Sequence, residues 1–193
     1  MSSWDAIVIG AGVIGTSVAY NLATLGVKRV LVLERDQIGS GTTAQSSGIL
    51  RTHYSVLENM ALAQQSWAIF ENFAEHLQDD EASAGLVRCG YLIASPDGPK
   101  LAPLHEALAA QRARGISVSH LTQSEAADIL PICRFDDAAL IGFEPNAGFA
   151  DAYLVASSYA RAARRLGVKF MEGERVTRLN LHQSCVSGVE TTS

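Results

Sequence analysis

The first 34 residues constrain the fold of this chain more than any other part of its sequence. They contain the apolar run Ala6 to Ile9, three glycines spaced as Gly10-x-Gly12-x-x-Gly15, and a second apolar run, Val30 to Leu33, closed by Glu34. The residues from Val13 to Leu25 have the composition of a helix, and Gly26 can end it. This order predicts a strand–helix–strand unit of a parallel sheet, with the glycines at the first strand-to-helix turn.

Each glycine has its own mechanical role in such a turn. Gly10 allows the tight exit from the strand, Gly12 lets a pyrophosphate approach the backbone, and Gly15 lets the helix pack closely on the strand. The first turn of the helix offers free N–H groups and a partial positive charge to the phosphates. Glu34 stands where a carboxylate can accept hydrogen bonds from a ribose. The pattern therefore predicts a dinucleotide site, and the alternative is an ordinary strand–helix–strand turn without a ligand.

The segment from Arg35 to Arg51 bears on which dinucleotide binds. An acid rather than a basic residue at position 34 argues against a bound 2′-phosphate, and thus against NADP. The segment is rich in glycine and in hydroxyl-bearing residues, whose backbone could wrap around a long cofactor. The alternative is a flexible surface loop. The position directly after the acid favours the cofactor interpretation.

At these residues the chain resembles the flavoproteins of the D-amino-acid oxidase type, in the branch that contains sarcosine oxidase, the β subunit of bacterial proline dehydrogenase and dimethylglycine dehydrogenase. The resemblance rests on the glycine motif from Gly10 to Gly26, on Glu34-Arg35, on residues 39–54, and on the later stretches 90–93, 121–126 and 148–176. It implies an α/β fold, with a Rossmann-like FAD-binding domain and an inserted α+β substrate domain, both incomplete here.

The resemblance also implies roles for individual residues. The cofactor is FAD, held noncovalently because Gln45 stands where some relatives carry the histidine that attaches the flavin. The residues implied in binding it are Gly10, Ala11, Gly12, Val13, Ile14 and Gly15 at the pyrophosphate, Glu34 and Arg35 at the ribose, Gly41, Thr42, Thr43, Gly48, Ile49 and Leu50 along the phosphates and the isoalloxazine, and Val176 at the adenine. Arg51 matches a position that holds the substrate carboxylate, which suits a planar guanidinium. Its alternatives are a surface arginine or a brace for the flavin loop.

The activity that the resemblance implies is oxidation of the C–N bond of a small secondary amine or amino acid such as sarcosine, proline or dimethylglycine. A hydride passes to the flavin, and water hydrolyses the imine. Members of the family are longer, so we expect this chain to be an N-terminal portion. The resemblance also allows it to be one subunit of a hetero-oligomer. One alternative is a catalytically incomplete nucleotide-binding fragment that needs a partner chain. Another, an NAD-dependent dehydrogenase, fits the glycine-rich segment poorly.

Composition excludes other classes of function. The net charge of −5 offers no basic patch for nucleic acid, and no apolar run is long enough to span a bilayer. The N-terminus lacks the basic region of a secretory signal, which predicts a cytoplasmic protein. Cys89, Cys133 and Cys185 fit neither a disulfide framework nor a metal site, and we expect buried, reduced thiols.

The chain is expected to divide into three segments. Residues 1–85 form the first part of the FAD-binding domain, residues 86–150 begin the substrate domain, and residues 151–193 return to the FAD-binding domain. A stripe of apolar residues from Val56 to Leu77 predicts one long amphipathic helix with Trp67 in the core. Thr122-x-x-Glu125 predicts a capping box, and Asp151 a helix N-cap. His53 is expected in a solvated loop, with a position near the flavin as the alternative. The arginines at 161, 164 and 165 are expected on a solvated helix face.

Overall fold

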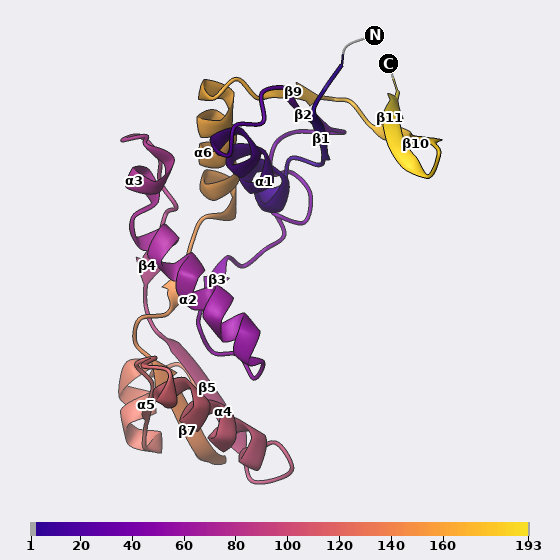
Figure 1. Cartoon of the computed structure of the whole chain (residues 1–193). Helices are drawn as coiled ribbons and strands as arrows, with labels where there is room; N and C mark the ends of the chain where they lie inside the picture. Colours follow the sequence, from indigo (N-terminus) through magenta and orange to yellow (C-terminus); the bar gives the residue numbers. More distant parts are fainter. Residues whose placement is uncertain (1–2, 193) are drawn as a thin grey trace. The chain divides into compact units, whose positions relative to one another are not determined.

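The structure is a computed structural model that describes residues 3–192 and consists of two compact units (Figure 1). The first unit comprises Met1–Gly48, Asn72–Gly85 and Asp151–Ser193, and the second comprises Ile49–Glu71 and Leu86–Ala150. Residues 49–71 thus belong with residues 86–150, whereas the sequence groups them with the N-terminal segment. The reason is a strand pairing, because Ile49 and Leu50 pair with Phe149 and Gly148.

The first unit is built on a three-stranded parallel sheet. Its strands are β1 (Ala6–Ile9), β2 (Val30–Glu34) and β9 (Lys169–Glu172), in the order β1-β2-β9. Residues 30–33 of the central strand are all buried, as expected for a parallel strand between two neighbours. An antiparallel hairpin of β10 (Val176–His182) and β11 (Cys185–Thr191) follows. The predicted strand–helix–strand order and the Rossmann-like parallel sheet are confirmed.

Two helices of the first unit pack against each other through small residues. They are α1 (Val13–Thr24) and α6 (Ala152–Arg165), and Ala19, Ala156, Ala160 and Ala163 are fully buried on them. The short helix α3 (Phe73–Leu77) joins this core through aromatic contacts. The Tyr159 ring packs edge-on against Tyr20 and Phe73, with ring centroids 5.6 and 5.4 Å away. Edge-to-face geometry at these distances is the favoured arrangement of aromatic pairs.

Both ends of α6 are fixed by polar groups. The Asp151 carboxylate accepts hydrogen bonds from the backbone N–H groups of Tyr153 and Leu154, each at 2.9 Å, which confirms the predicted N-cap. The arginines near the other end are 42–48% exposed, as predicted for a solvated face, and they also form ion pairs. Arg161 and Arg165 both pair with the carboxylate of Asp79, at 2.8 and 3.1 Å, and that side chain is only 7% exposed. Asp79 is far from these arginines in the sequence, so the spacing of residues along the helix could not predict the ion pairs.

The second unit contains two small antiparallel sheets. The first sheet has the strand order β3-β8-β4 and consists of β3 (Ile49–Leu50), β8 (Gly148–Phe149) and β4 (Val87–Arg88). The second has the strand order β5-β7-β6 and consists of β5 (Tyr91–Pro96), β7 (Ala138–Glu144) and β6 (Ser119–His120). The helices are α2 (Leu57–Glu71), α4 (Leu101–Ala113) and α5 (Gln123–Ile129). Ala126, Phe135 and Ile141 form a buried cluster between α5 and β7. The predicted capping box of α5 is present, with reciprocal bonds between Thr122 and Glu125.

The long helix predicted across residues 56–77 is wrong in one respect. It breaks at Asn72, and its two parts, α2 and α3, lie in different units. Met60 is the one buried residue of α2, and Trp67 is half-buried rather than in the core. The apolar periodicity is real, but most of the α2 stripe lines an open hollow instead of a packed interface.

Two further expectations from the sequence are also wrong. His53 is buried, with only 8% of its surface exposed. Its Nδ1 atom lies 2.6 Å from the side-chain amide nitrogen of Gln111, which is also buried. The three cysteines are free, as predicted, but exposed rather than buried. Cys89 and Cys133 lie in connecting segments and Cys185 in the outer hairpin, so none occupies a core-facing position.

Candidate functional site

The turn between β1 and α1 has the geometry that its glycines predict. Gly10 has a φ of +98°, a conformation that favours glycine, and its N–H donates to the Leu33 carbonyl at 2.8 Å. A Cβ atom on Gly15 would lie 1.9 Å from the Gly10 carbonyl oxygen, so only glycine permits this approach of helix to turn. The conformation of the turn is therefore set by these residues themselves.

Gly12 stands at the N-terminus of α1, where backbone donors are free to bind an anion. It is the N-cap of the helix and has no side-chain cap of its own. A Cβ atom there would lie 2.8 Å from the Thr43 hydroxyl oxygen. That hydroxyl accepts a hydrogen bond from the Val13 N–H at 3.0 Å. The space in front of the helix N-terminus is thus bounded by the Gly12 backbone on one side and by Thr43 on the other.

The segment after β2 is folded against this turn and is not a free surface loop. The Gly39 N–H donates to the Ala11 carbonyl at 3.0 Å, and the Ile38 N–H donates to the Glu172 carboxylate at 3.1 Å. Successive turns follow, with the N–H groups of Ala44 and Gln45 donating to carbonyls three residues earlier. The glycine-rich composition therefore serves a compact loop that brings Thr42 and Thr43 to the glycine turn and the N-terminus of α1. We call this arrangement of turn, helix N-terminus and loop the cradle.

Glu34 points toward the glycine turn. Its Oε2 atom accepts from the Ala11 N–H at 2.7 Å, and its Oε1 atom accepts from the Asp36 N–H at 2.9 Å. An ionised carboxylate has about four acceptor positions, so two remain for hydroxyl donors after these bonds. The carboxylate is thus held in place by backbone donors and keeps the capacity to bind a diol.

Two adjoining hollows of about 530 and about 460 Å³ occupy this side of the first unit. Both are lined by Gly10, Gly12, Thr42 and Thr43; the larger adds Glu34, Arg35, Gly41, Glu174, Arg175 and Val176, and the smaller adds Val13, Ile14, Gly15 and Ser46. Residues from four separated stretches of the chain therefore meet here, and volumes of this size are typical of ligand sites. Arg175 and Glu174 are lining residues that sequence reasoning missed. Their position directly before Val176 is the signal that could have indicated them.

Some of the predicted cofactor residues do not line these hollows. Ala11 is fully buried and contributes its N–H to Glu34. Gly48 is the last residue of the N-terminal segment of the first unit, and its N–H donates to the Ser46 hydroxyl at 3.1 Å. Ile49 and Leu50 form β3 in the second unit. Their predicted role at the flavin stays a prediction.

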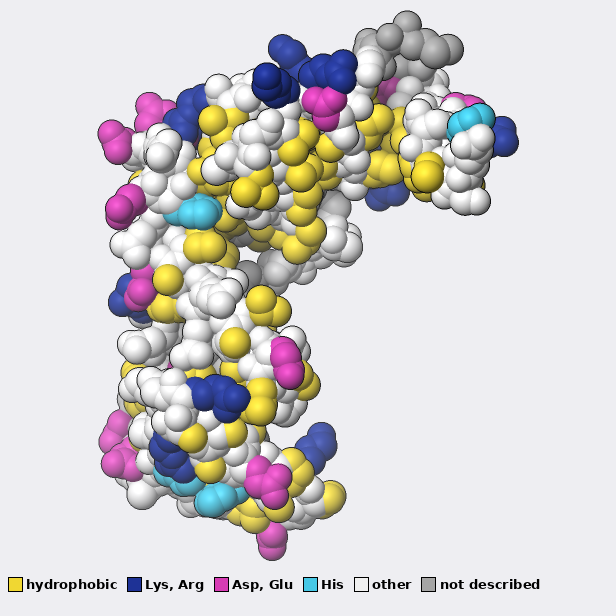
Figure 2. Space-filling model, in the orientation of Figure 1, with side chains coloured by type: hydrophobic (Ala, Val, Ile, Leu, Met, Phe, Trp, Pro, Cys, Tyr) yellow, Lys and Arg dark blue, Asp and Glu magenta, His cyan; other side chains and the backbone are white. Residues whose placement is uncertain are grey.

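An exposed apolar surface continues from the smaller hollow along α1. Ile9, Ile14 and Val18 line that hollow and are 55%, 75% and 43% exposed. Figure 2 shows hydrophobic side chains gathered on this face of the first unit around α1. Contiguous exposed apolar side chains of this kind mark surfaces that bind something, rather than chance exposure.

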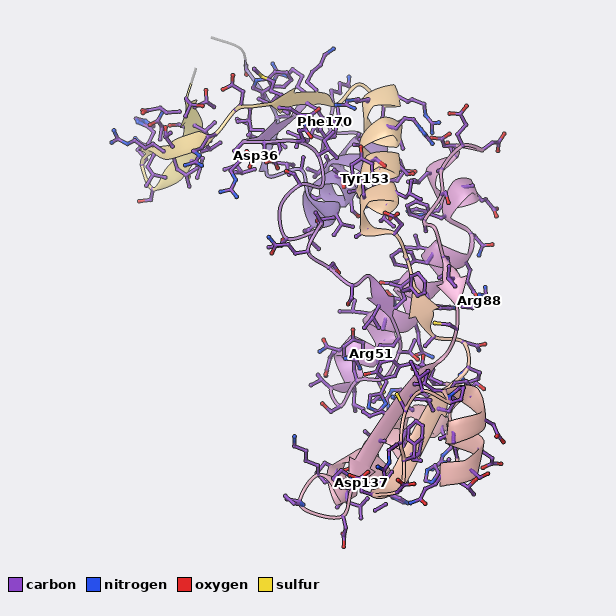
Figure 3. The ribbon with its side chains drawn as sticks, turned by 180° about the vertical axis from the view of Figure 1, so that it is seen from behind. Asp36, Arg51, Arg88, Asp137, Tyr153 and Phe170 are labelled. Atoms are coloured by element: carbon purple, nitrogen blue, oxygen red, sulfur yellow. The ribbon has the colours of Figure 1, made fainter. Side chains whose placement is uncertain are left out.

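Arg51 lies in the second unit, directly after β3 (Figure 3). Its guanidinium donates to the His53 carbonyl and lies 4.8 and 5.2 Å from the ring centres of Tyr54 and Tyr91. These contacts hold the flat side chain by cation–π attraction without neutralising its charge, and among residues 3–192 it forms no ion pair. Arg51 therefore keeps free donors for an anion.

The hollow next to Arg51 has a volume of about 480 Å³. It is lined by Ile49, Leu50, Arg51 and Tyr54, and by Asn59, Leu62, Ala63, Ser66, Trp67 and Phe70 of α2. One cationic group above a largely apolar wall suits a small carboxylate with an apolar body. This arrangement disfavours the alternative of a plain surface arginine.

Within residues 3–192, no three histidine, cysteine or acidic side chains come together in a way that could hold a metal ion. None of the helices in this range has the length and apolar character needed to cross a bilayer.

The geometry of the first unit defines a class, the dinucleotide-binding α/β proteins with a phosphate-binding turn between the first strand and helix. Comparison with known proteins narrows the class. The family described as "FAD dependent oxidoreductase", the D-amino-acid oxidase family, matches residues 5–193. The chain belongs to this FAD-dependent oxidoreductase family.

The relatives give the extent of the similarity. The chain is 27% identical to sarcosine oxidase subunit beta of Arthrobacter sp, over 98% of this chain and 48% of that protein. It is similar in structure to L-proline dehydrogenase from P. horikoshii, with a TM-score of 0.88 at 24% identity over 99% of this chain and 50% of that one. For glycine oxidase from Bacillus cereus the TM-score is 0.80 at 26% identity, over 98% and 52%. The chain spans about half the length of these relatives.

The residues at the turn fit the cofactor of this family. A Cβ atom on Gly12 would reach toward the Thr43 hydroxyl, so the missing side chain leaves room for a pyrophosphate at the helix N-terminus. Glu34 keeps acceptor positions for ribose hydroxyls, and Val176 lies at the same hollow. When bound, FAD supplies a two-electron acceptor for hydride.

Proposed function

We propose that this chain binds FAD noncovalently and takes part in oxidising the C–N bond of a small secondary amine or amino acid, similar to sarcosine, proline or dimethylglycine. The observation that carries the proposal is the pair of adjoining hollows where the glycine turn, Glu34, the Thr42–Thr43 loop and Val176 meet. In the reaction the substrate carbon loses a hydride and its nitrogen a proton, and water then hydrolyses the imine to amine and carbonyl products.

The proposed role of the glycine turn and Thr43 is to hold the pyrophosphate. The Val13 N–H donates to the Thr43 hydroxyl, so the other N–H groups of the first turn of α1 would bind the pyrophosphate, aided by the positive end of the helix dipole. Glu34 would orient the adenosine ribose, and the backbone at Val176 would contact the adenine. Gln45 offers no imidazole for a covalent attachment, which supports noncovalent binding.

Arg51 is proposed to bind the substrate carboxylate. Its guanidinium is held between two tyrosine rings, has no carboxylate partner among the described residues, and lines a hollow with apolar walls. A planar fork of donors suits a carboxylate better than an ammonium would. Sarcosine oxidase subunit beta, to which the chain is similar, is named for an amino acid of this size.

Because the chain spans about half the length of its relatives, we propose that full activity needs a further polypeptide segment, in the manner of a subunit. The alternative is a chain that binds the nucleotide and performs no chemistry alone. A cytoplasmic location also stays a prediction; three free thiols are compatible with a reducing compartment.

Purified chain incubated with FAD tests the proposal. We expect flavin absorbance to remain with the protein after gel filtration, and we expect anaerobic addition of sarcosine, proline or dimethylglycine to bleach it if the catalytic set is complete. Retained flavin without bleaching would favour the nucleotide-binding alternative. Protein that stays colourless with excess FAD would contradict the proposal.

A further inference from the structure

The second unit contains a buried carboxylate that the proposed reaction does not use. Glu144, at the end of β7, is only 4% exposed. Its Oε1 atom accepts hydrogen bonds from the Thr52 N–H at 2.8 Å and from the Thr52 hydroxyl at 2.6 Å. Its Oε2 atom is buried and has no hydrogen-bond partner among residues 3–192. One half of this carboxylate is thus fixed, and the other half lacks a donor.

Glu144 has no ion-pair partner within 4 Å among residues 3–192. Burial lowers the pKa of the nearby His53, and its Nδ1 lies 2.6 Å from the Gln111 amide nitrogen, which donates to a neutral ring. The Arg51 guanidinium donates to the His53 carbonyl. A buried carboxylate without a counter-charge is costly, so a cation bound there would offset a large penalty.

A separate hollow of about 190 Å³ lies beside this carboxylate. Its volume corresponds to about six water molecules. It is lined by Thr52, Gln64, Trp67, Gly115, Ile116, Ser117, Glu144 and Asn146. This lining contains no arginine or lysine, and it offers amide and hydroxyl oxygens and the face of an indole ring.

We propose that this hollow binds a small alkylammonium ion with N–H donors, such as methylammonium. The Glu144 carboxylate would supply the counter-charge, and the oxygens of Gln64, Ser117 and Asn146 would accept N–H hydrogen bonds. The Arg88 guanidinium lies 5.9 Å from the centre of the Trp67 ring, so the cation would contact the face of the ring that Arg88 does not cover. A divalent metal would need several oxygen anions, and Glu144 is the one acid in this lining. The inference goes beyond the proposed function and does not rest on it.

Calorimetric titration of the 193-residue chain with methylammonium chloride, at constant ionic strength set by NaCl, tests the proposal. We expect saturable binding of one ion per chain, and no comparable heat with methanol, which has the same size without the charge. Absence of binding to the folded chain, or equal binding of methanol, would overturn the proposal.

Glu144→Gln identifies the carboxylate. The amide oxygen can still accept from Thr52, but the charge is gone, so methylammonium affinity should fall at least about tenfold. Glu106→Gln, which removes an exposed carboxylate from α4 of the same unit, is the matched control and should leave the affinity unchanged. Equal binding by wild type and Glu144→Gln would assign the heat to another site.

Two further variants keep the proposal testable if Glu144→Gln does not fold. Trp67→Leu removes the π face and should weaken methylammonium about fivefold. Arg134→Ala removes an arginine that is 89% exposed and should leave methylammonium affinity within about twofold of wild type. A chain that binds methylammonium but not FAD would refute the proposed function alone. If Trp67→Leu left methylammonium affinity unchanged, the ion would not lie beside this ring and the inference would fail.

Discussion

The two candidate binding regions of this protein are made from different kinds of groups. The cradle in the first unit consists mostly of backbone, with glycines, N–H groups and a helix N-terminus supplied by one short stretch of chain. The polar groups of the second unit are side chains from separate elements, with Arg51 after β3, Tyr91 on β5 and Glu144 on β7. A site made of backbone requires glycines, whose missing side chains leave the backbone accessible. A site made of side chains requires that the fold bring the right residues together from separate elements.

This difference governs how each region responds to substitution. In the cradle a side chain added at Gly12 would enter the space in front of α1, because a Cβ atom there would lie 2.8 Å from the Thr43 hydroxyl. In the second unit a removed side chain takes away one contact and leaves the hollow in place. The largest effects on binding are therefore expected at the glycines of the first unit.

Gly12→Val should have the largest effect. The new side chain would enter the space in front of α1, where a Cβ atom alone already lies 2.8 Å from the Thr43 hydroxyl. We expect FAD affinity to fall by about 100-fold, measured by flavin retained after gel filtration and by circular dichroism to confirm folding. Gly188→Ala is the control, because a Cβ atom there meets nothing within 4 Å and its affinity should stay unchanged. A Gly12→Val protein with normal FAD content would show that the cradle is not the site.

Arg51→Ala tests the second unit with a smaller expected effect. Loss of the guanidinium should weaken binding of a small carboxylate such as acetate by about tenfold, while FAD retention stays normal. Trp67 lines the same hollow, so its fluorescence reports the titration. Arg134→Ala is the matched control, because that arginine is 89% exposed and pairs with Asp136 at the surface. Loss of flavin instead of loss of carboxylate affinity would reassign Arg51 to the cofactor.

The sequence was sufficient to predict the cradle because its determinants are local. The motif from Gly10 to Gly15 and the acid at 34 predicted the turn, the helix and the parallel strands. Thr42 and Thr43, which the family resemblance implies at the cofactor, line the same hollow, and their role stays a prediction. A position that requires glycine can be recognised from the sequence alone, since the requirement depends on the backbone conformation of that residue and of its close neighbours.

The interior of the second unit could not be predicted in the same way. His53 is buried because Gln111 lies beside it, and Glu144 is buried because Thr52 supplies two donors. These partners are far apart in the sequence and are brought together only by the sheets. The break of the helix at Asn72 has the same origin, because α3 packs through Phe73 and Leu77 into the first unit.

Thr43 provides a finer test of the cradle, because a side chain contributes there. Thr43→Val removes the acceptor of the Val13 N–H and should lower the free energy of unfolding by about 1 kcal/mol, as loss of a helix cap does. FAD affinity should fall about threefold to tenfold if the hydroxyl also contacts the phosphates. Thr43→Ser keeps the hydroxyl and should retain both properties. Loss of stability without loss of FAD affinity would restrict Thr43 to a structural role.

The smallest expected effect concerns Asp79, the buried carboxylate that ties residues 72–85 to α6. Hydrogen bonding from Arg161 lowers the pKa of Asp79 below its usual value. A lowered folded-state pKa adds stability above the unfolded pKa of about 4, and that contribution is lost as the pH falls through the folded value. Because Arg161 and Arg165 are 42% and 44% exposed, solvent screening limits the contribution to about 1 kcal/mol.

The measurement is the difference in unfolding free energy between wild type and Asp79→Asn, from urea titrations between pH 7 and pH 3. We expect wild type to be more stable at pH 7 and the difference to shrink below about pH 4. Asp136→Asn, whose carboxylate is 72% exposed, should differ from wild type by less than about 0.5 kcal/mol at every pH. A difference for Asp79→Asn that is independent of pH would mean that packing, and not charge, joins this segment to α6.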